Sequence, residues 1–528
     1  MHTHIHSLPV ELLSRIFLIG WQEDTEPDDI LTSQVNFEVL VSHVCHRWRE
    51  VALQSPVIWT TIHLRTVPHM RRALVYLKRR GQHLIDVYID TTSEEDHIPG
   101  FTLFRDEFLP VFDLVTPHVD RWRSLHLKVR DLQCKADARQ VLSKCDGAPH
   151  LETLHLWHIE NWGTPERLYT AIGPPPVVIF HQRLPMLKNI LLTGVNIPWT
   201  DSSFLRNLTT VQFALHSDDV RIPYELWRDM LRGSPHLERL SLHYSGPRFG
   251  SGDWPDEKIL LPGLREVDLT NMDPPYLLSL VKRLRMPNVK KLRLELELPD
   301  QDFTAFIQYL VEPGDETEES VLLNGRDGAG EGDVRADLYA NGAPPEKADA
   351  DSDDEAEPGG RRRGPFFPSL ESLSVCALEC EPAVWRRFLQ TAGHRLDTFE
   401  VDFGRMKKTL FEELLTVDVD EASEAGTHSD LPTTTTTATA TSAAHILLPG
   451  LHTLRLSGLI PTEVRRYVDF RHAHFHSSPA ASSSSSSPPP PPPLVASPIK
   501  WLLEQRQCDE SLDTWFADVG LYVRGRGE

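Results

Sequence analysis

Residues 235–242 read Pro-His-Leu-Glu-Arg-Leu-Ser-Leu, and this pattern recurs along the chain. Written as P-x-L-x-x-L-x-L, with Val or Ile allowed for Leu, it begins at Pro149, Pro185, Pro235, Pro262, Pro287, Pro368 and Pro449. The last two apolar residues of each copy are two positions apart, which places them on one face of a short strand. The proline lies where a loop tolerates its missing N–H. The pattern therefore predicts a series of short, similar strands.

The copies recur at a roughly constant interval. Weaker copies without the proline start at Leu84, Trp122, Leu208 and Leu396, and Trp59 is the candidate for the first copy. Most spacings are 21–38 residues, and residues 224–231 show the helical apolar spacing expected between strands. One strand and one helix per 21–29 residues is the period of leucine-rich repeats. We predict an α/β solenoid formed by a leucine-rich-repeat array. We expect this array to be irregular, because the Asn or Cys that usually follows the last Leu is missing.

Two biased segments account for the two longest spacings. Residues 313–365 hold 15 acidic and 6 basic side chains, and removing these 53 residues reduces a spacing of 81 to 28. Residues 418–444 are acidic and then rich in Thr and Ala, and removing these 27 residues reduces a spacing of 55 to 28. Both lack the apolar content that offsets ordering entropy. We predict that they are disordered insertions into single repeats.

The ends of the array are predicted from composition as well. Residues 477–498 contain six consecutive Ser and six consecutive Pro, which predicts a disordered linker with a stiff polyproline part. Residues 499–525 carry apolar side chains at helical spacing, which predicts a C-terminal helical segment. Two roles are open for it, a cap on the solenoid or a separate docking helix. The solenoid itself is assigned to residues 63–476.

The charge balance excludes several classes of partner. The 528 residues carry 54 basic and 76 acidic side chains, a formal net charge of −22. Nucleic-acid affinity depends on Lys and Arg, so no nucleic-acid partner is predicted. An acidic chain is also unsuited to anionic membrane surfaces, and no run approaches the roughly 18 apolar residues of a membrane span. No membrane partner is therefore predicted.

The cysteines and the N-terminal residues point to a cellular location. The six Cys include no C-x-x-C pair, which argues against a disulfide framework or a zinc module. The first residues also lack the features of a signal peptide. We expect a reduced intracellular location, cytoplasmic, nuclear or both.

Residues 5–62 follow a different pattern. Pro9, Leu13 and Phe17, with the apolar residues between them, have the spacing of one helix face, and residues 40–52 predict a second amphipathic helix. Asn36 is the candidate cap of this second helix. An acidic stretch that contains Pro27 separates the two helices. We predict a separate N-terminal helical module.

The module contains a series of short motifs, which are Leu8-Pro9, Glu11-Leu12-Leu13, Ile16-Phe17, Val44-Cys45-x-x-Trp48-Arg49 and Pro56-x-x-Trp59. With these motifs the module resembles an F-box, and most closely the F-box-like proteins of mushroom-forming fungi, which carry irregular leucine-rich repeats. The resemblance covers about a tenth of the chain, and the segment at 18–39 is longer and more acidic than usual.

The resemblance implies a function. F-box proteins are substrate receptors of SCF-type cullin-RING ubiquitin ligases, in which the F-box docks on a Skp-type adaptor, the adaptor joins a cullin scaffold, and the repeats bind a substrate protein. It implies no enzyme activity and no cofactor for this chain. The residues that would face the adaptor are Leu8, Pro9, Ile16, Val44, Cys45 and Trp48.

Two alternatives remain open. The same six residues could instead pack the module against the first repeat. The whole chain could be a leucine-rich-repeat scaffold that acts outside any ubiquitin ligase, and co-purification with the adaptor and cullin separates the two functions. An enzyme with a site in the insertions is a third hypothesis, which their low complexity disfavours.

Candidate substrate-binding residues lie between the alternating apolar residues of the strands, on the predicted inner face. They are His155, Trp157, Arg239, His243, Lys291 and Arg293. Aromatic residues and Arg contribute most to interface energies, which makes these positions candidates. The alternative, which is favoured for any one of these residues alone, is an ordinary mixed surface. Acidic residues at equivalent positions, such as Glu266 and Asp268, predict that no single sign of charge dominates this face.

Two runs of alternating histidine, at residues 2–6 and 472–476, were considered as metal ligands. Alternate histidines on a strand share a face and can bind a metal ion. No Asp, Glu or Cys cluster matches either run in spacing, and no metal site is predicted.

Overall fold

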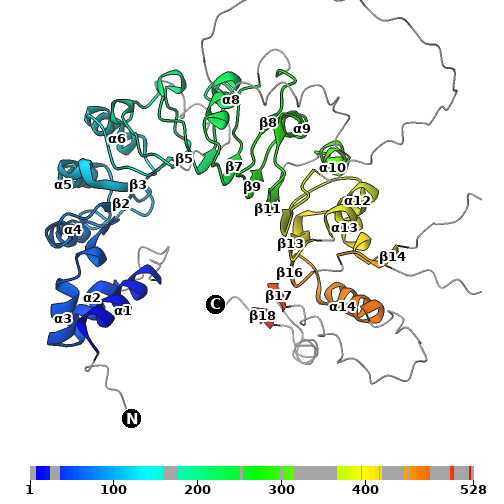
Figure 1. The fold of residues 1–528 in the computed structure, drawn as a ribbon, viewed down its shortest axis with the longest axis horizontal. Helices are drawn as coiled ribbons and strands as arrows, with labels where there is room; N and C mark the ends of the chain where they lie inside the picture. Colours follow the sequence, from blue (N-terminus) through cyan, green and yellow to red (C-terminus); the bar gives the residue numbers. More distant parts are fainter. Residues whose placement is uncertain are drawn as a thin grey trace, which may run out of the picture.

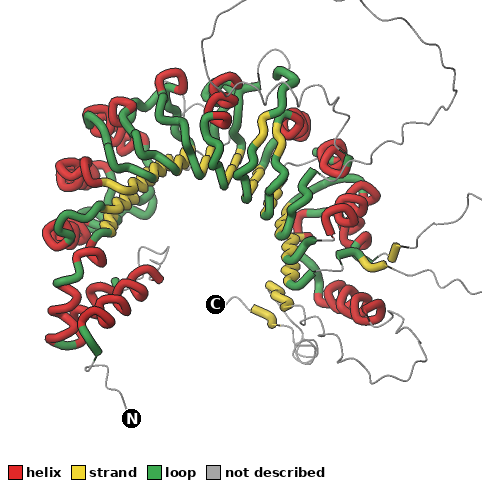
Figure 2. The backbone as a smooth tube through the Cα atoms, in the orientation of Figure 1, coloured by secondary structure: helices red, strands yellow, loops and turns green. Residues whose placement is uncertain are grey.

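The structure is a computed structural model that describes residues 8–23, 36–158, 176–249, 254–297, 301–312, 366–393, 395–415, 417–418, 445–448, 451–475, 500–504 and 522–524. The described elements follow a curved arc that starts with three helices (Figure 1). Short strands line the inner side of the arc, and most helices lie on its outer side (Figure 2). This large α/β arrangement is solenoid-like, as the repeat pattern predicts.

The N-terminal module contains α1 (Val10–Glu23), α2 (Phe37–Val44), α3 (His46–Leu53) and a 3-10 turn at Pro56–Trp59. The predicted continuous helix over 40–52 is wrong, because Cys45 breaks it. Cys45 is extended, with φ −159° and ψ 170°, and its thiol accepts a hydrogen bond from the backbone N–H of Trp48 at 3.5 Å. Asn36 occupies the cap position of α2, but its side chain accepts a hydrogen bond from Arg72 rather than from the helix.

Fourteen of the described strands form one sheet in which neighbouring strands are parallel. Each of the seven strict copies and each weaker copy forms a strand of this sheet. In spatial order the strands are β1 (Thr61–Leu64), β2 (Ile85–Asp90), β3 (Trp122–Val129), β4 (Thr153–His158), β5 (Asn189–Thr193), β6 (Thr210–Ala214), β7 (Arg239–His243), β9 (Glu266–Thr270), β11 (Lys291–Glu295), β12 (Ser372–Cys376), β13 (Thr398–Asp402), β16 (Thr453–Ser457), β17 (Lys500–Glu504) and β18 (Tyr522–Arg524).

Helices cover the outer side of the sheet (Figure 2). They are α4 (Val67–Arg79), α5 (Arg105–Val115), α6 (Leu132–Lys144), α8 (Tyr224–Arg232), α9 (Pro274–Lys282), α10 (Thr304–Val311), α12 (Pro382–Gly393), α13 (Lys408–Glu413) and α14 (Pro461–Phe475). Local signals define their ends: the carboxylate of Asp131 caps α6 by accepting from the N–H groups of Gln133 and Cys134 at 2.8 and 3.2 Å.

Other intervals hold 3-10 turns and small ladders. The turns are Thr116–Arg121, Phe180–Gln182, Trp199–Asp201 and Phe403–Arg405. The ladders pair β8 (Ile259–Leu260) with β10 (Leu284–Arg285), and β14 (Val417–Asp418) with β15 (His445–Ile446).

The core lies between the sheet and the helices. On β4, Leu154, Leu156 and His158 are buried while Thr153, His155 and Trp157 are half-buried, and the other repeat strands alternate in a similar way. The predicted helix at 224–231 is confirmed as α8, which buries an apolar face that includes Trp227. The repeat leucines therefore hold the strands against the outer layer.

The strands on either side of each predicted insertion pair directly with each other. β11 pairs directly with β12, although residues 313–365 fall between them in sequence and lie outside the described residues. The backbone N–H of Phe366 donates to the carbonyl of Leu310 at 3.2 Å, so the chain leaves and re-enters the repeat at one place. β13 pairs with β16 in the same way across the second insertion, of which residues 419–444 lie outside the described part.

The predicted helical segment at 499–525 is wrong where the structure describes it. Residues Lys500–Glu504 pair as β17 with β16, and Tyr522–Arg524 pair as β18 with β17. A terminal strand presents a row of unpaired backbone N–H and C=O groups, and pairing with another strand satisfies them. This pairing overrides the helical spacing. The predicted linker at 477–498 lies outside the described residues.

Candidate functional site

Two rows of side chains run along the inner face of the sheet, because the strands are in register and alternate residues face the same way. On β1 to β7, the first row contains His63, Tyr88, His126, His155, Leu191, Gln212 and Ser241. On β2 to β7, the second row contains Asp90, Lys128, Trp157, Thr193, Ala214 and His243.

All six predicted substrate-binding residues lie on repeat strands, and each is next to a buried leucine of the same strand. His155 and Trp157 belong to β4, Arg239 and His243 to β7, and Lys291 and Arg293 to β11. β5 and β6 separate the first pair from the second, and β9 separates the second from the third. The six residues therefore form three places along the sheet, not one cluster.

Carboxylates compensate the predicted cations on β7 and β11. Glu266 on the strand between them accepts from Arg239 at 2.7 Å and from Lys291 at 2.9 Å. These hydrogen bonds lower the pKa of Glu266. Arg293 donates to Glu295 on its own strand at 2.8 Å. Opposite charges are thus paired here, which leaves these three cations less suited to contact a partner.

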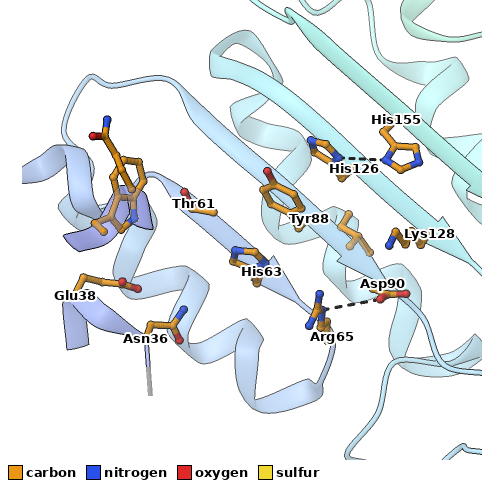
Figure 3. A pocket seen from close by; sticks show the side chains of 13 residues that line it. Asn36, Glu38, Thr61, His63, Arg65, Tyr88, Asp90, His126, Lys128 and His155 are labelled. Atoms are coloured by element: carbon orange, nitrogen blue, oxygen red, sulfur yellow. Dashed lines mark hydrogen bonds and ion pairs between the residues drawn. The ribbon is translucent and has the colours of Figure 1, made fainter. Parts of the chain in front are cut away.

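A ladder of aromatic rings occupies the first row on β1 to β4 (Figure 3). The ring of His63 stacks on Tyr88 at 4.6 Å between centroids, and Tyr88 stacks on His126 at 4.3 Å. The rings of His126 and His155 are nearly perpendicular, and their Nδ1 atoms are 3.3 Å apart. Sequence reasoning missed His63, Tyr88 and His126, which come from the weaker copies. Each of these three residues lies between alternating apolar residues of its strand, as His155 does. This shared position could have predicted that they lie on the inner face.

The ladder forms one wall of a cleft of about 560 Å³ between the N-terminal module and the first strands (Figure 3). Asn36, at the cap position of α2, and Glu38 of α2 line the opposite side, together with Trp21 and Gln22 of α1. Tyr76 of α4 donates its hydroxyl to Glu38, and burial raises the pKa of that hydroxyl. Residues of the module and residues of the solenoid therefore line the same cleft.

The imidazoles of His126 and His155 are neutral at pH 7. Burial lowers the pKa of His126 to about 4, and it lowers the pKa of His155 to about 4 as well. The nearby positive charge of Lys128 contributes to both shifts. The hydrogen bond between the two Nδ1 atoms therefore joins one donor and one acceptor.

A second buried histidine, His216, fixes a loop in the core. Its Nε2 donates to the carbonyl of Val195 at 3.0 Å, and its Nδ1 accepts from Ser245 at 2.7 Å. Burial lowers its pKa to about 4, below the value of about 6.5 expected in the unfolded chain. Because the unfolded state takes up the proton first, this histidine stabilises the fold above pH 6.5, and the contribution is lost as the pH falls towards 4.

We expect the free energy of unfolding to decrease between pH 7 and pH 5, by up to roughly 2 kcal/mol from His216 alone. The matched variant is His216→Gln, whose amide can donate and accept but cannot take up a proton. Urea denaturation at both pH values should show a smaller decrease for the variant. An equal decrease in both proteins would assign the pH dependence to other groups.

The N-terminal module presents apolar side chains to solvent. Eight of the nineteen exposed large apolar side chains in the described chain lie between residues 10 and 57. They are Val10, Leu12, Ile16, Ile19, Leu40, Val44, Leu53 and Val57. The predicted face of the first helix is divided: Leu13 and Phe17 are buried, whereas Leu12 and Ile16 are exposed.

The six predicted adaptor-facing residues differ in exposure. Pro9, Ile16 and Val44 are exposed, and Leu8 and Cys45 are half-buried. Trp48 packs inside the module, with its ring centroid 5.1 Å from that of Phe17. The neighbour of this ring belongs to α1 of the module and not to the first repeat.

Two distant parts of the predicted motif come together. The guanidinium of Arg47 donates to the carbonyl of Leu8, which places the Leu8-Pro9 opening beside the junction between α2 and α3. Ile16 lies one helical turn from Leu12, and Val44 one turn from Leu40, so each helix presents a pair of exposed apolar residues.

No group of three or more His, Cys, Asp or Glu residues in the described chain is placed to hold a metal ion. His472 and His474 lie within helix α14 and not on a strand, and residues 2–6 fall outside the described part. No described helix combines the length and apolar composition that crossing a membrane requires. No family model matches this chain, and no curated protein is found to be similar to it.

Proposed function

We propose that this chain is the substrate-recognition adaptor of an SCF-type ubiquitin ligase. The observation that carries the proposal is the set of exposed apolar side chains on the three-helix module, among them Leu12, Ile16, Leu40 and Val44. Concentrated apolar surface on a folded protein marks a site of protein association. The F-box-like motif around these residues favours a Skp-type adaptor, bound to a cullin scaffold, as the partner.

The shape of the solenoid supports the second half of this function. The inner face of the leucine-rich-repeat-like array is a long curved surface, a common binding surface of solenoids. It is built from strands that follow the module in sequence, so adaptor and substrate would occupy different parts of one arc (Figure 1). In this role the chain has no active site, transfer chemistry belongs to the ligase partners, and the complex works in the cytoplasm, the nucleus or both.

Co-expression tests this function directly. The tagged full chain, expressed with a Skp-type adaptor and a cullin, is expected to elute with both in one complex during size-exclusion chromatography. Blocking the proteasome in cells should then enrich ubiquitinated proteins in the same pull-down. Elution of a folded chain without adaptor and cullin would favour the alternative, a repeat scaffold that acts outside any ubiquitin ligase.

A further inference from the structure

Four side chains form a compact arrangement at the end of the aromatic ladder. His126 and Lys128 lie on β3, and His155 and Trp157 lie opposite them on β4. Residues two apart on a strand share a face, and neighbouring strands are about 4.8 Å apart. We call this group the His–Lys–Trp square. All four side chains are half-buried, so each has a part that a partner can reach.

Lys128 is the unusual member of the square. Five other cations on the inner face have carboxylate partners within 4 Å: Arg65, Arg239, Lys291, Arg293 and Arg455. The ammonium of Lys128 has no hydrogen-bond or ion-pair partner among the residues that the structure describes. A half-buried charge without a partner loses hydration and gains no compensating interaction. The site is therefore electrostatically complementary to an anion.

The two imidazoles add hydrogen-bonding groups beside this cation. Because each ring is neutral and one Nδ1 donates to the other, one of the two rings carries its proton on Nε2. That N–H is a further donor within the square. A carboxylate with two acceptor oxygens can accept from the ammonium and from this ring together.

Trp157 supplies a fixed apolar surface at the remaining corner. The guanidinium of Arg130 lies 5.0 Å from the centre of its ring. Arg130 is itself held by the carboxylate of Asp90 and the carbonyl of Thr91. An immobilised tryptophan contributes contact area at little cost in conformational entropy, as binding hot spots do.

We propose that the His–Lys–Trp square binds a carboxylate side chain within an acidic segment of the substrate protein, a role that rests on the function proposed above. The carboxylate contacts Lys128 and the imidazole pair, and the residue beside it packs on Trp157. The cleft leads from the square past Tyr88 and His63 towards the module, and gives the rest of the segment a path.

The same residues disfavour a phosphate group. Phosphate recognition typically uses the planar fork of Arg, which donates two parallel hydrogen bonds. Here both nearby guanidinium groups, those of Arg65 and Arg130, already interact with Asp90. A single ammonium remains, and it matches the single charge of a carboxylate.

A phage-displayed library of random peptides, selected on the full-length chain, tests this specificity. We expect the wild-type chain to enrich Asp and Glu next to an apolar residue, and Lys128→Glu to enrich Lys and Arg instead. Lys144→Glu is the matched control, because Lys144 is an exposed lysine on the outer helix α6 and should retain the acidic preference. Fluorescence anisotropy with the best wild-type peptide should show at least tenfold weaker binding to Lys128→Gln, which corresponds to about 1.4 kcal/mol.

Three outcomes would overturn the inference: no enrichment of acidic residues by the wild type, an unchanged preference in Lys128→Glu, or tighter binding of the peptide when phosphoserine replaces its acidic residue. Circular dichroism melting checks that each variant is folded. Co-purification of the Skp-type adaptor is measured on the same preparations. A chain that selects acidic peptides but does not bind the adaptor would refute the ligase function and support this site. A chain that binds the adaptor but does not select acidic peptides would support the ligase function and refute this site.

Discussion

Val44→Asp is expected to remove most of the Skp-type adaptor from a pull-down while leaving the melting temperature of the chain unchanged. The Val44 side chain is 57% exposed at the end of α2, so a charge there costs the isolated chain little. In a complex the same carboxylate would be buried in an apolar contact without a partner, at a cost of at least about 2 kcal/mol. This corresponds to a roughly 30-fold weaker Kd, measurable by surface plasmon resonance.

Leu260→Asp is the matched control for this variant. Leu260 is 56% exposed, nearly the same as Val44, but it lies on β8 in the middle of the solenoid. We expect Leu260→Asp to bind the adaptor like the wild type. Equal binding by both variants would show that the apolar surface of the module is not the docking surface. Equal loss in both would indicate a general effect of added charge.

The contrast between Ile16 and Trp48 shows what such an interface would require. Both belong to the F-box-like motif, yet Ile16 is exposed while Trp48 packs on Phe17 inside the module. Substitution of Trp48 would therefore change folding and docking together. Variants at exposed positions such as Ile16 and Val44 separate the two effects, because they add no cavity to the core.

The repeat pattern could be predicted because each strand uses the same two apolar positions. Leu240 and Leu242 on β7, for example, are both buried, and equivalent residues recur on every copy, so hydrophobic periodicity alone located the strands. Long insertions did not obscure the pattern, because the strands on either side of them still pair directly. This is a local signal repeated many times.

Other features depended on contacts that no local pattern records. The apolar spacing around Cys45 fits one continuous helix, so it gives no sign of the break at this residue. Strand β17 depends on pairing with the edge of β16, which is distant in sequence. The cleft was hidden for a related reason. His63 and Lys128 are ordinary polar residues of separate repeats, and only the parallel register places them on one wall.

Trp227→Ala is expected to lower the free energy of unfolding by about 3–5 kcal/mol, the usual cost of deleting a large aromatic side chain from a core. Trp227 lies on α8, is fully buried, and packs between the helix layer and Phe213 on β6, with 6.3 Å between ring centroids. Alanine would leave a cavity where one repeat contacts the next. Urea denaturation followed by circular dichroism measures the change.

Trp157→Ala removes the same side chain from the inner face, where it is half-buried and contacts Arg130. We expect Trp157→Ala to lower the free energy of unfolding by only about 1 kcal/mol, because solvent can fill the space and only one cation–π contact is lost.

Neighbouring repeats stabilise each other in a solenoid, so Trp227→Ala should also broaden the unfolding transition by uncoupling the two halves of the array. Similar losses in both variants would contradict the assignment of the core to the space between sheet and helices. A sharp single transition in Trp227→Ala would instead show that the array unfolds as one unit despite the cavity.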